Sequence, residues 1–285
     1  MSMKSYYRLW ALLTALLSFE YWALNYHTQL SVIHFLQAHF RSMSSTNLST
    51  AAGRPISYLL GWAGFGLILL TNLYILRRKW APLKKIGTLP GWLNFHIFCG
   101  LLGPTLIVFH SALKVRGVVG ISFWSMMIVA LSGIIGRYIY VQLLREEKLT
   151  SNEAKNWSEK LERLRISSGA AQVTTQDVDL AKELALNFVG FPEGGVAAQI
   201  SLPRILFESL WGDLRLAFSA PPPVPGLPEV SRHILAAFAV SRRRAVLLEP
   251  FRKMLGYWHS FHLPFALFMY IAAIIHIISA LTFGI

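Results

Sequence analysis

Four of the nine histidines share one spacing inside two apolar stretches. His96 and His110 are fourteen residues apart, as are His262 and His276. At about 100° per residue, fourteen residues fall only about 40° short of four helical turns, so each pair lies on one helix face. The two imidazoles are about 21 Å apart along the axis, most of the roughly 30 Å hydrocarbon core of a bilayer. Two such helices would offer axial ligands to two haem irons, one near each membrane surface.

A fifth histidine competes for one of these positions. His259 lies one turn before His262 and shares roughly its face. Its spacing of seventeen residues to His276 misses a whole number of turns by about 100°, so we prefer His262 as the ligand. His259 then keeps a hydrogen bond to a haem propionate or a quinone contact as its alternative roles.

A haem also needs room beside the helix backbone and cations for its propionates. Gly100 and Gly103 follow His96 on the same face and would leave a flat strip for the edge of the macrocycle. The propionates need donors. We expect Lys114 and Arg116 to serve the outer haem and Arg137 the inner one. For each cation, ordinary snorkelling to the membrane interface is the alternative.

The composition indicates an integral membrane protein. Of the 285 residues, 54% are hydrophobic and 14% are charged, against about 25% charged in soluble domains. The single cysteine, Cys99, excludes an intramolecular disulfide and a Cys-x-x-Cys-His attachment, so any haem is held without covalent bonds. The net charge of +13 is better explained by the loops of a membrane protein than by nucleic acid.

The elements that must position the histidines are five predicted membrane spans. We expect an all-α integral membrane protein in which five transmembrane helices form a haem-binding bundle, with a small helical cytoplasmic lobe. The predicted segments are 1–56 with the first span and a periplasmic loop, 57–143 with spans two to four, 144–255 as the helical insert, and 256–285 with span five. Apolar periodicity in the insert predicts helices over 145–165, 177–188 and 202–218.

The basic residues orient these spans. Arg77, Arg78, Lys79, Lys84 and Lys85 follow the second span at once, which marks a cytoplasmic loop. The N-terminus is therefore expected in the cytoplasm and the C-terminus in the periplasm. Spans three and five then run parallel, so His96 pairs with His262 and His110 with His276.

One acidic residue lies near the end of the first span. We interpret Glu20 as an interfacial carboxylate, with a proton-relay or quinone-site role as the alternative.

The chain resembles the ferric-reductase-like and cytochrome b561-like diheme membrane cytochromes. The resemblance rests on the two fourteen-residue histidine pairs and on the run from Trp258 to Pro264. It implies two stacked b haems that pass electrons across a membrane, with His96 and His262 on the inner haem and His110 and His276 on the outer one. The chain departs from the family in its long insert. We also expect no C-terminal flavin and nicotinamide domain of the kind that NADPH oxidases and ferric reductases carry.

The expected function is transmembrane electron transfer in the inner membrane of a bacterium. The protein would be a subunit of a respiratory or redox complex rather than a stand-alone enzyme. Its redox partner would be a periplasmic cytochrome that exchanges electrons with the outer haem, an iron–sulfur protein or a flavoprotein. The basic cytoplasmic lobe would dock an acidic redox partner. One alternative is a quinol-linked membrane oxidoreductase with a quinone as a further cofactor. The other is a haem-free membrane anchor or assembly subunit.

Overall fold

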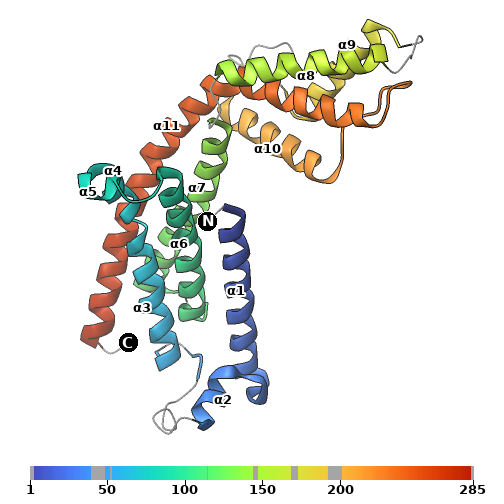
Figure 1. Ribbon diagram of the computed structural model, residues 1–285. Helices are drawn as coiled ribbons and strands as arrows, with labels where there is room; N and C mark the ends of the chain where they lie inside the picture. The colour runs from blue at the N-terminus through green and yellow to red at the C-terminus, as the bar shows by residue number, and fades with distance from the viewer. Residues whose placement is uncertain are drawn as a thin grey trace. The chain divides into compact units, whose positions relative to one another are not determined.

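The computed structural model (Figure 1) describes residues 3–39, 49–51, 53–113, 115–143, 147–167, 173–191 and 201–283. Within these ranges every regular element is a helix and no strand occurs. The helices are α1 (Met3–Tyr26), the 3₁₀ turn η1 (Thr28–Leu30), α2 (Val32–His39), α3 (Pro55–Leu70), α4 (Leu73–Lys79), α5 (Ala81–Lys84), α6 (Leu89–Ser111), α7 (Gly117–Leu143), α8 (Glu147–Ser167), α9 (Thr175–Phe188), α10 (Leu202–Phe218) and α11 (Val230–Phe283).

The chain forms two compact units. The first contains residues 1–134 and 261–285, and the second contains residues 135–260, against a predicted insert of 144–255. The helices α7 and α11 contribute residues to both units. We call the second unit the lobe and the first the bundle.

Four segments of the described chain are long and apolar enough to cross a membrane. They are Pro55–Lys79, Leu89–Ser111, Val119–Leu143 and Val230–Phe283. The prediction of an all-helical, multi-pass membrane protein is confirmed at this level. The first predicted span forms the helix α1, but α1 is not among the four, so five spans stay a prediction.

Two glycines let α3 and α6 pack closely in the bundle. A Cβ atom added to Gly64 would lie 2.9 Å from the carbonyl oxygen of Gly103, and one added to Gly103 would lie 3.0 Å from that of Gly64. Neither backbone leaves room for a side chain at this crossing. The helices run antiparallel, because Ser57 at the start of α3 lies beside His110 near the end of α6.

The other bundle helices pack around this pair. Along α1, the Tyr6 ring lies 5.3 Å from that of Phe98 and the Tyr21 ring 5.4 Å from that of Phe109, so α1 runs parallel to α6. The segments of α7 and α11 in the bundle join α3 in a buried cluster, which contains Ile68, Phe123, Met126 and Met269.

The lobe is built from α8, α9 and α10 packed on the first half of α11. These helices agree with the apolar periodicity of the insert, and α10 has the predicted bounds. The last helix differs from the prediction, because α11 begins at Val230 rather than near residue 256. Pro250 and Gly256 lie inside it, so tertiary packing overrides both helix breakers. Phe251, between them, is fully buried.

The lobe centres on one buried cation. The guanidinium of Arg243 is fully buried and pairs with Asp213, and it also donates to the carbonyl oxygens of Val189 and Ser209. Asp213 further accepts from the Tyr138 hydroxyl at 2.8 Å and from Gln142 Nε2 at 3.0 Å. These bonds join α10 and α11 to the last two turns of α7.

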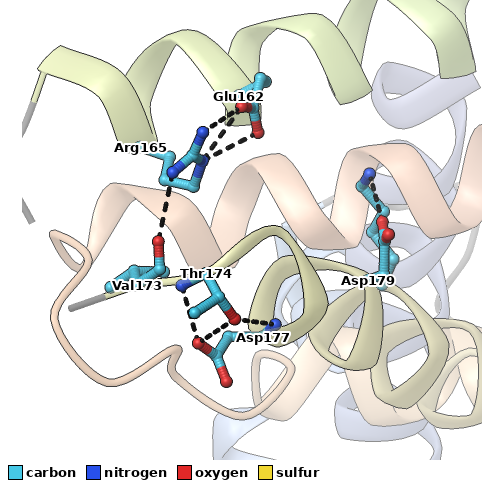
Figure 2. A network of polar contacts seen from close by, with 7 residues as sticks. Glu162, Arg165, Val173, Thr174, Asp177 and Asp179 are labelled. Carbon is cyan, nitrogen blue, oxygen red and sulfur yellow. Dashed lines mark hydrogen bonds and ion pairs between the residues drawn. The ribbon is translucent and has the colours of Figure 1, made fainter. Parts of the chain in front are cut away.

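The N-terminus of α9 carries a capping box (Figure 2). The Thr174 hydroxyl and the Thr174 amide donate to the Asp177 carboxylate, and the Asp177 amide donates back to the hydroxyl. The bond from the Thr174 hydroxyl, and to a lesser extent the bond from the Thr174 amide, hold the pKa of Asp177 below its usual value. Nearby, Arg165 donates to Glu162 and to the Val173 carbonyl oxygen, which ties α8 to the residue before this cap.

Gly64→Ala should destabilise the bundle, because the new methyl group would meet Gly103 O at 2.9 Å and Ile107 at 2.7 Å. We expect a loss of about 1–3 kcal/mol, seen as a lower thermal unfolding midpoint in detergent. Gly66→Ala is the matched control, since a Cβ there meets nothing within 4 Å. Equal midpoints for the two variants would contradict the close α3–α6 contact.

Asp177→Asn should lower the stability of the lobe at neutral pH but not in acid. Because the folded pKa of Asp177 is lowered, its contribution is present above the unfolded value and disappears as the pH falls through the folded value. The unfolding midpoints of wild type and variant should therefore begin to converge as the pH drops below about 4, the unfolded value, and should meet once the pH is below the lowered folded value. A gap of constant size from neutral pH into acid would refute the role of this cap.

Candidate metal centre

All four predicted ligands lie in the bundle. His96 and His110 are on α6, His262 and His276 are on α11, and each side chain is partly buried. Among the described residues, no group of three or more His, Cys, Asp or Glu side chains gathers around a common point. A bis-histidine haem needs only two protein ligands per iron, so the pairs are the relevant arrangement.

One pair meets across the two helices. The ring centres of His110 and His276 are 6.4 Å apart, with their planes inclined at 63°. An iron bound by both imidazoles, at about 2 Å per bond, would hold the ring centres about 6 Å apart. The separation therefore fits one metal ion between the two rings.

The relative direction of α6 and α11 determines which histidines form the second pair. Tyr270, six residues before His276, donates to the carbonyl oxygen of Ile68 at 2.9 Å. Ile68 packs on Gly103, seven residues before His110. Tyr270 and Gly103 thus meet at Ile68, and each precedes its histidine in the chain. The helices α6 and α11 therefore run parallel. Since each helix rises equally over fourteen residues, His96 and His262 should share a level about 21 Å away.

Backbone carbonyl groups fix the tautomer of both histidines on α6. His96 Nδ1 is 2.9 Å from Thr71 O, and His110 Nδ1 is 2.7 Å from Ser57 O. A carbonyl oxygen only accepts, so each Nδ1 carries the proton and each Nε2 keeps its lone pair. Metal-binding histidines commonly show this arrangement, in which the second ring nitrogen is oriented by an outer hydrogen bond.

A serine orients one histidine of α11 in the same way. The Ser132 hydroxyl donates to Val129 O at 2.8 Å, so its oxygen accepts from His262 Nδ1 at 2.7 Å. Gly133 lies beside this ring, with its Cβ direction 3.9 Å from His262 Cε1. His262 is thus held by α7 through Nδ1, whereas the two histidines of α6 are held by the α3–α4 segment.

The second span is interrupted at Thr71, whose carbonyl oxygen accepts from His96. Thr71 and Asn72 separate α3 from α4, and Thr71 O accepts a 3₁₀-type bond from the Tyr74 amide at 3.2 Å. Asn72 Nδ2 donates to the Tyr270 hydroxyl at 2.7 Å, which attaches α11 to the same break.

The spacing of these acceptors repeats the spacing of the histidines. Ser57 and Thr71 are fourteen residues apart, as are His110 and His96, and the helices are antiparallel. Gly64 lies seven residues from each acceptor. Gly103 likewise lies seven residues from each histidine, so the closest approach of the backbones is midway between the two levels.

The two glycines of α6 differ in what lies beside them. Gly103 packs against α3, with its Cβ direction toward Ile68 and Gly64 O, and its place in a haem-facing strip stays a prediction. Gly100 has open space around its Cβ direction, and its contact with a cofactor stays a prediction. Gly61 is a further residue of the site that the sequence did not predict. Its Cβ direction points at the His110 ring, 2.7 Å from Nδ1, so that ring lies directly on the α3 backbone.

The predicted accessory residues are distributed over both units. Arg116 is exposed, and Lys114 lies outside the described residues. Arg137 lies in the lobe, 5.8 Å above the Tyr140 ring. His259 is an exposed lobe residue, and its ring meets Trp258 at 5.8 Å. Their roles toward propionates or a quinone stay predictions.

Glu20 caps a helix. Its carboxylate accepts from the amides of Val32 at 3.1 Å and Ile33 at 2.9 Å, and from the hydroxyl of Ser31. A carboxylate at this helix N-terminus satisfies donors that α2 leaves unpaired. This agrees with its interpretation as an interfacial group.

Sequence reasoning missed the residues that orient the ligands, namely Gly61, Ser57, Thr71 and Ser132. For Gly61 and Ser132, the available signal was a small or hydroxyl-bearing residue within an apolar span. Ser57 and Thr71 act through their carbonyl oxygens, which the residue type does not reveal.

Neither a protein-family model, nor a curated protein, nor a solved structure matches the chain.

Proposed function

We propose that the protein carries electrons across a bacterial inner membrane on two b-type haems. The observation that supports this most is the His110–His276 pair, whose rings are separated by 6.4 Å, as one iron between them requires. The proton of His110 is fixed on Nδ1, so its other nitrogen is the one presented for coordination. The diheme family that the chain resembles uses this kind of ligand.

The residues divide into ligands and the groups that orient them. His110 and His276 would hold the outer haem, and His96 and His262 the inner one. Ser57, Thr71 and Ser132 supply the acceptors that aim three of these imidazoles. When bound, each haem supplies a one-electron Fe(III)/Fe(II) couple.

His262 is favoured over His259 as the inner ligand. Ser132 holds His262 through Nδ1, in the same manner as Thr71 holds His96. His259 is exposed, and its ring meets Trp258. The residue fourteen positions after His259 is Ala273, so His259 does not share the fourteen-residue spacing with His276.

The proposed topology has five spans, with the N-terminus inside and the C-terminus in the periplasm. It requires spans one, three and five to run in one direction. The ring contacts of α1 with α6 and the bonding of α11 to Ile68 agree with that requirement.

The electron donor is proposed to be a separate redox protein or a membrane quinol. Every Asp and Glu except Glu20 lies in residues 144–255, where they nearly balance the basic residues. Net charge therefore gives the lobe little preference for an acidic partner. Because Glu20 is used in capping α2, no structural observation favours a quinone site there.

Purified protein should show b-type bands in reduced-minus-oxidised spectra, with about two haems per chain. His110→Ala and His276→Ala should each lose the same haem, and His96→Ala and His262→Ala the other. Pyridine haemochrome assays and redox titration of each variant measure this. His259→Ala is the matched control and should keep both haems.

Pigment-free protein that is otherwise folded would refute electron transfer and favour a membrane anchor. Unchanged haem content in His110→Ala would refute the ligand assignment, as would loss of different haems from His110→Ala and His276→Ala.

Ser132→Ala should raise the midpoint potential of the inner haem and weaken haem retention there. The substitution removes the acceptor of His262 Nδ1. A less basic imidazole stabilises ferric iron less, and lost outer hydrogen bonds cost about 10–100-fold in metal affinity. Ser125→Ala is the matched control on the same helix, because the Ser125 hydroxyl donates to Ile121 O at 2.6 Å. Equal shifts in both variants would contradict orientation by Ser132.

A further inference from the structure

The helix α10 has apolar side chains on two opposite faces. The face toward the lobe interior buries Ile205 together with Ser209 and Gly212. A Cβ on Gly212 would collide with the Val189 carbonyl, so this face cannot turn away from α9. The opposite face is apolar, and its exposed side chains are Phe207, Leu210, Trp211, Leu214 and Phe218.

This apolar face of α10 is continuous and rich in aromatic residues. Phe207 is followed after three or four residues by the neighbours Leu210 and Trp211, and Leu214 and Phe218 continue this helical spacing. Phe207 is 66% exposed and Phe218 is 86% exposed. The Phe207 and Trp211 rings are stacked 6.4 Å apart, and Arg215 lies 5.6 Å over Trp211. Aromatic rings beside arginines are typical of helices that lie in a membrane interface.

The attachment of α10 to α7 determines what covers this face. Asp213 of α10 accepts from Tyr138 and Gln142, and Ile205 packs on Ile139, all near the end of α7. The apolar segment Val119–Leu143 has 25 residues, or about 37 Å of helix. That exceeds the roughly 30 Å hydrocarbon core but not the 40–45 Å that includes the headgroups. The last turns of α7, and α10 with them, therefore lie at the level of the headgroups.

We propose that the apolar face of α10 lies on the bilayer that α7 crosses. Lipid acyl chains cover the five apolar residues, and Arg215 reaches the phosphate layer. A second protein is not needed to explain the exposed face, because the attachment to α7 already holds α10 at the lipid surface. This assignment does not depend on haem binding.

The test uses nitroxide labels on the full-length protein in nanodiscs of phosphatidylethanolamine and phosphatidylglycerol. Leu210→Cys and Leu214→Cys carry labels on the apolar face. Asn156→Cys, an exposed position on α8, is the matched control. Wild type is the labelling blank, because its one cysteine, Cys99, is buried. None of these positions belongs to the proposed haem site.

Power-saturation electron paramagnetic resonance then compares collisions with oxygen and with a water-soluble nickel chelate. Labels at 210 and 214 should collide more with oxygen and less with nickel than the label at 156, as expected for acyl chains. Nickel access equal to that at 156 would show a face open to water and overturn the assignment. Shielding from both reagents, with dipolar broadening between labels, would mean that a second copy covers it and would overturn it equally.

Discussion

An imidazole N–H inside a membrane has no water to bond with, so the protein must supply its acceptor. The packing of the bundle depends on this requirement. Two histidines on α6 place such groups within the apolar segment. The nearest acceptors of their Nδ1 protons are the carbonyl oxygens of Ser57 and Thr71. Carbonyl groups can serve only if another backbone comes close. The contact at Gly64 and Gly103, where neither helix has room for a methyl group, makes that approach possible.

The two acceptors lie in different parts of the second span. The Ser57 carbonyl belongs to the regular helix α3, whereas the Thr71 carbonyl lies where α3 ends. At Thr71 the ladder changes to a 3₁₀ turn, and the Thr71 carbonyl accepts from Tyr74 and from His96. The bond from Asn72 to Tyr270 fixes the same place to α11, which carries His262 and His276. One local irregularity therefore serves two helices.

Periodicity predicted what depends on side-chain type and spacing. It placed both histidine pairs on single helix faces, and it predicted α10 with the bounds that the structure has. It did not predict what depends on a neighbour. Gly103 could be put on the histidine face, but only packing shows that α3 occupies the space beside it. Likewise the segment of span five is predicted to begin at residue 256, whereas α11 begins at Val230 and continues past the buried Phe251. Thr71 offered no signal, since its backbone, not its side chain, meets His96.

The use of main-chain acceptors has an evolutionary consequence. Almost any residue can replace Thr71 without removing the oxygen that orients His96, and the carbonyl at position 57 is equally independent of its side chain. Position 132 differs, because the acceptor for His262 is the serine hydroxyl itself. Related chains should drift freely at 71 while keeping a hydroxyl or another short acceptor at 132. Glycine at 61, 64 and 103 should be retained, because these positions bring the carbonyl groups within reach.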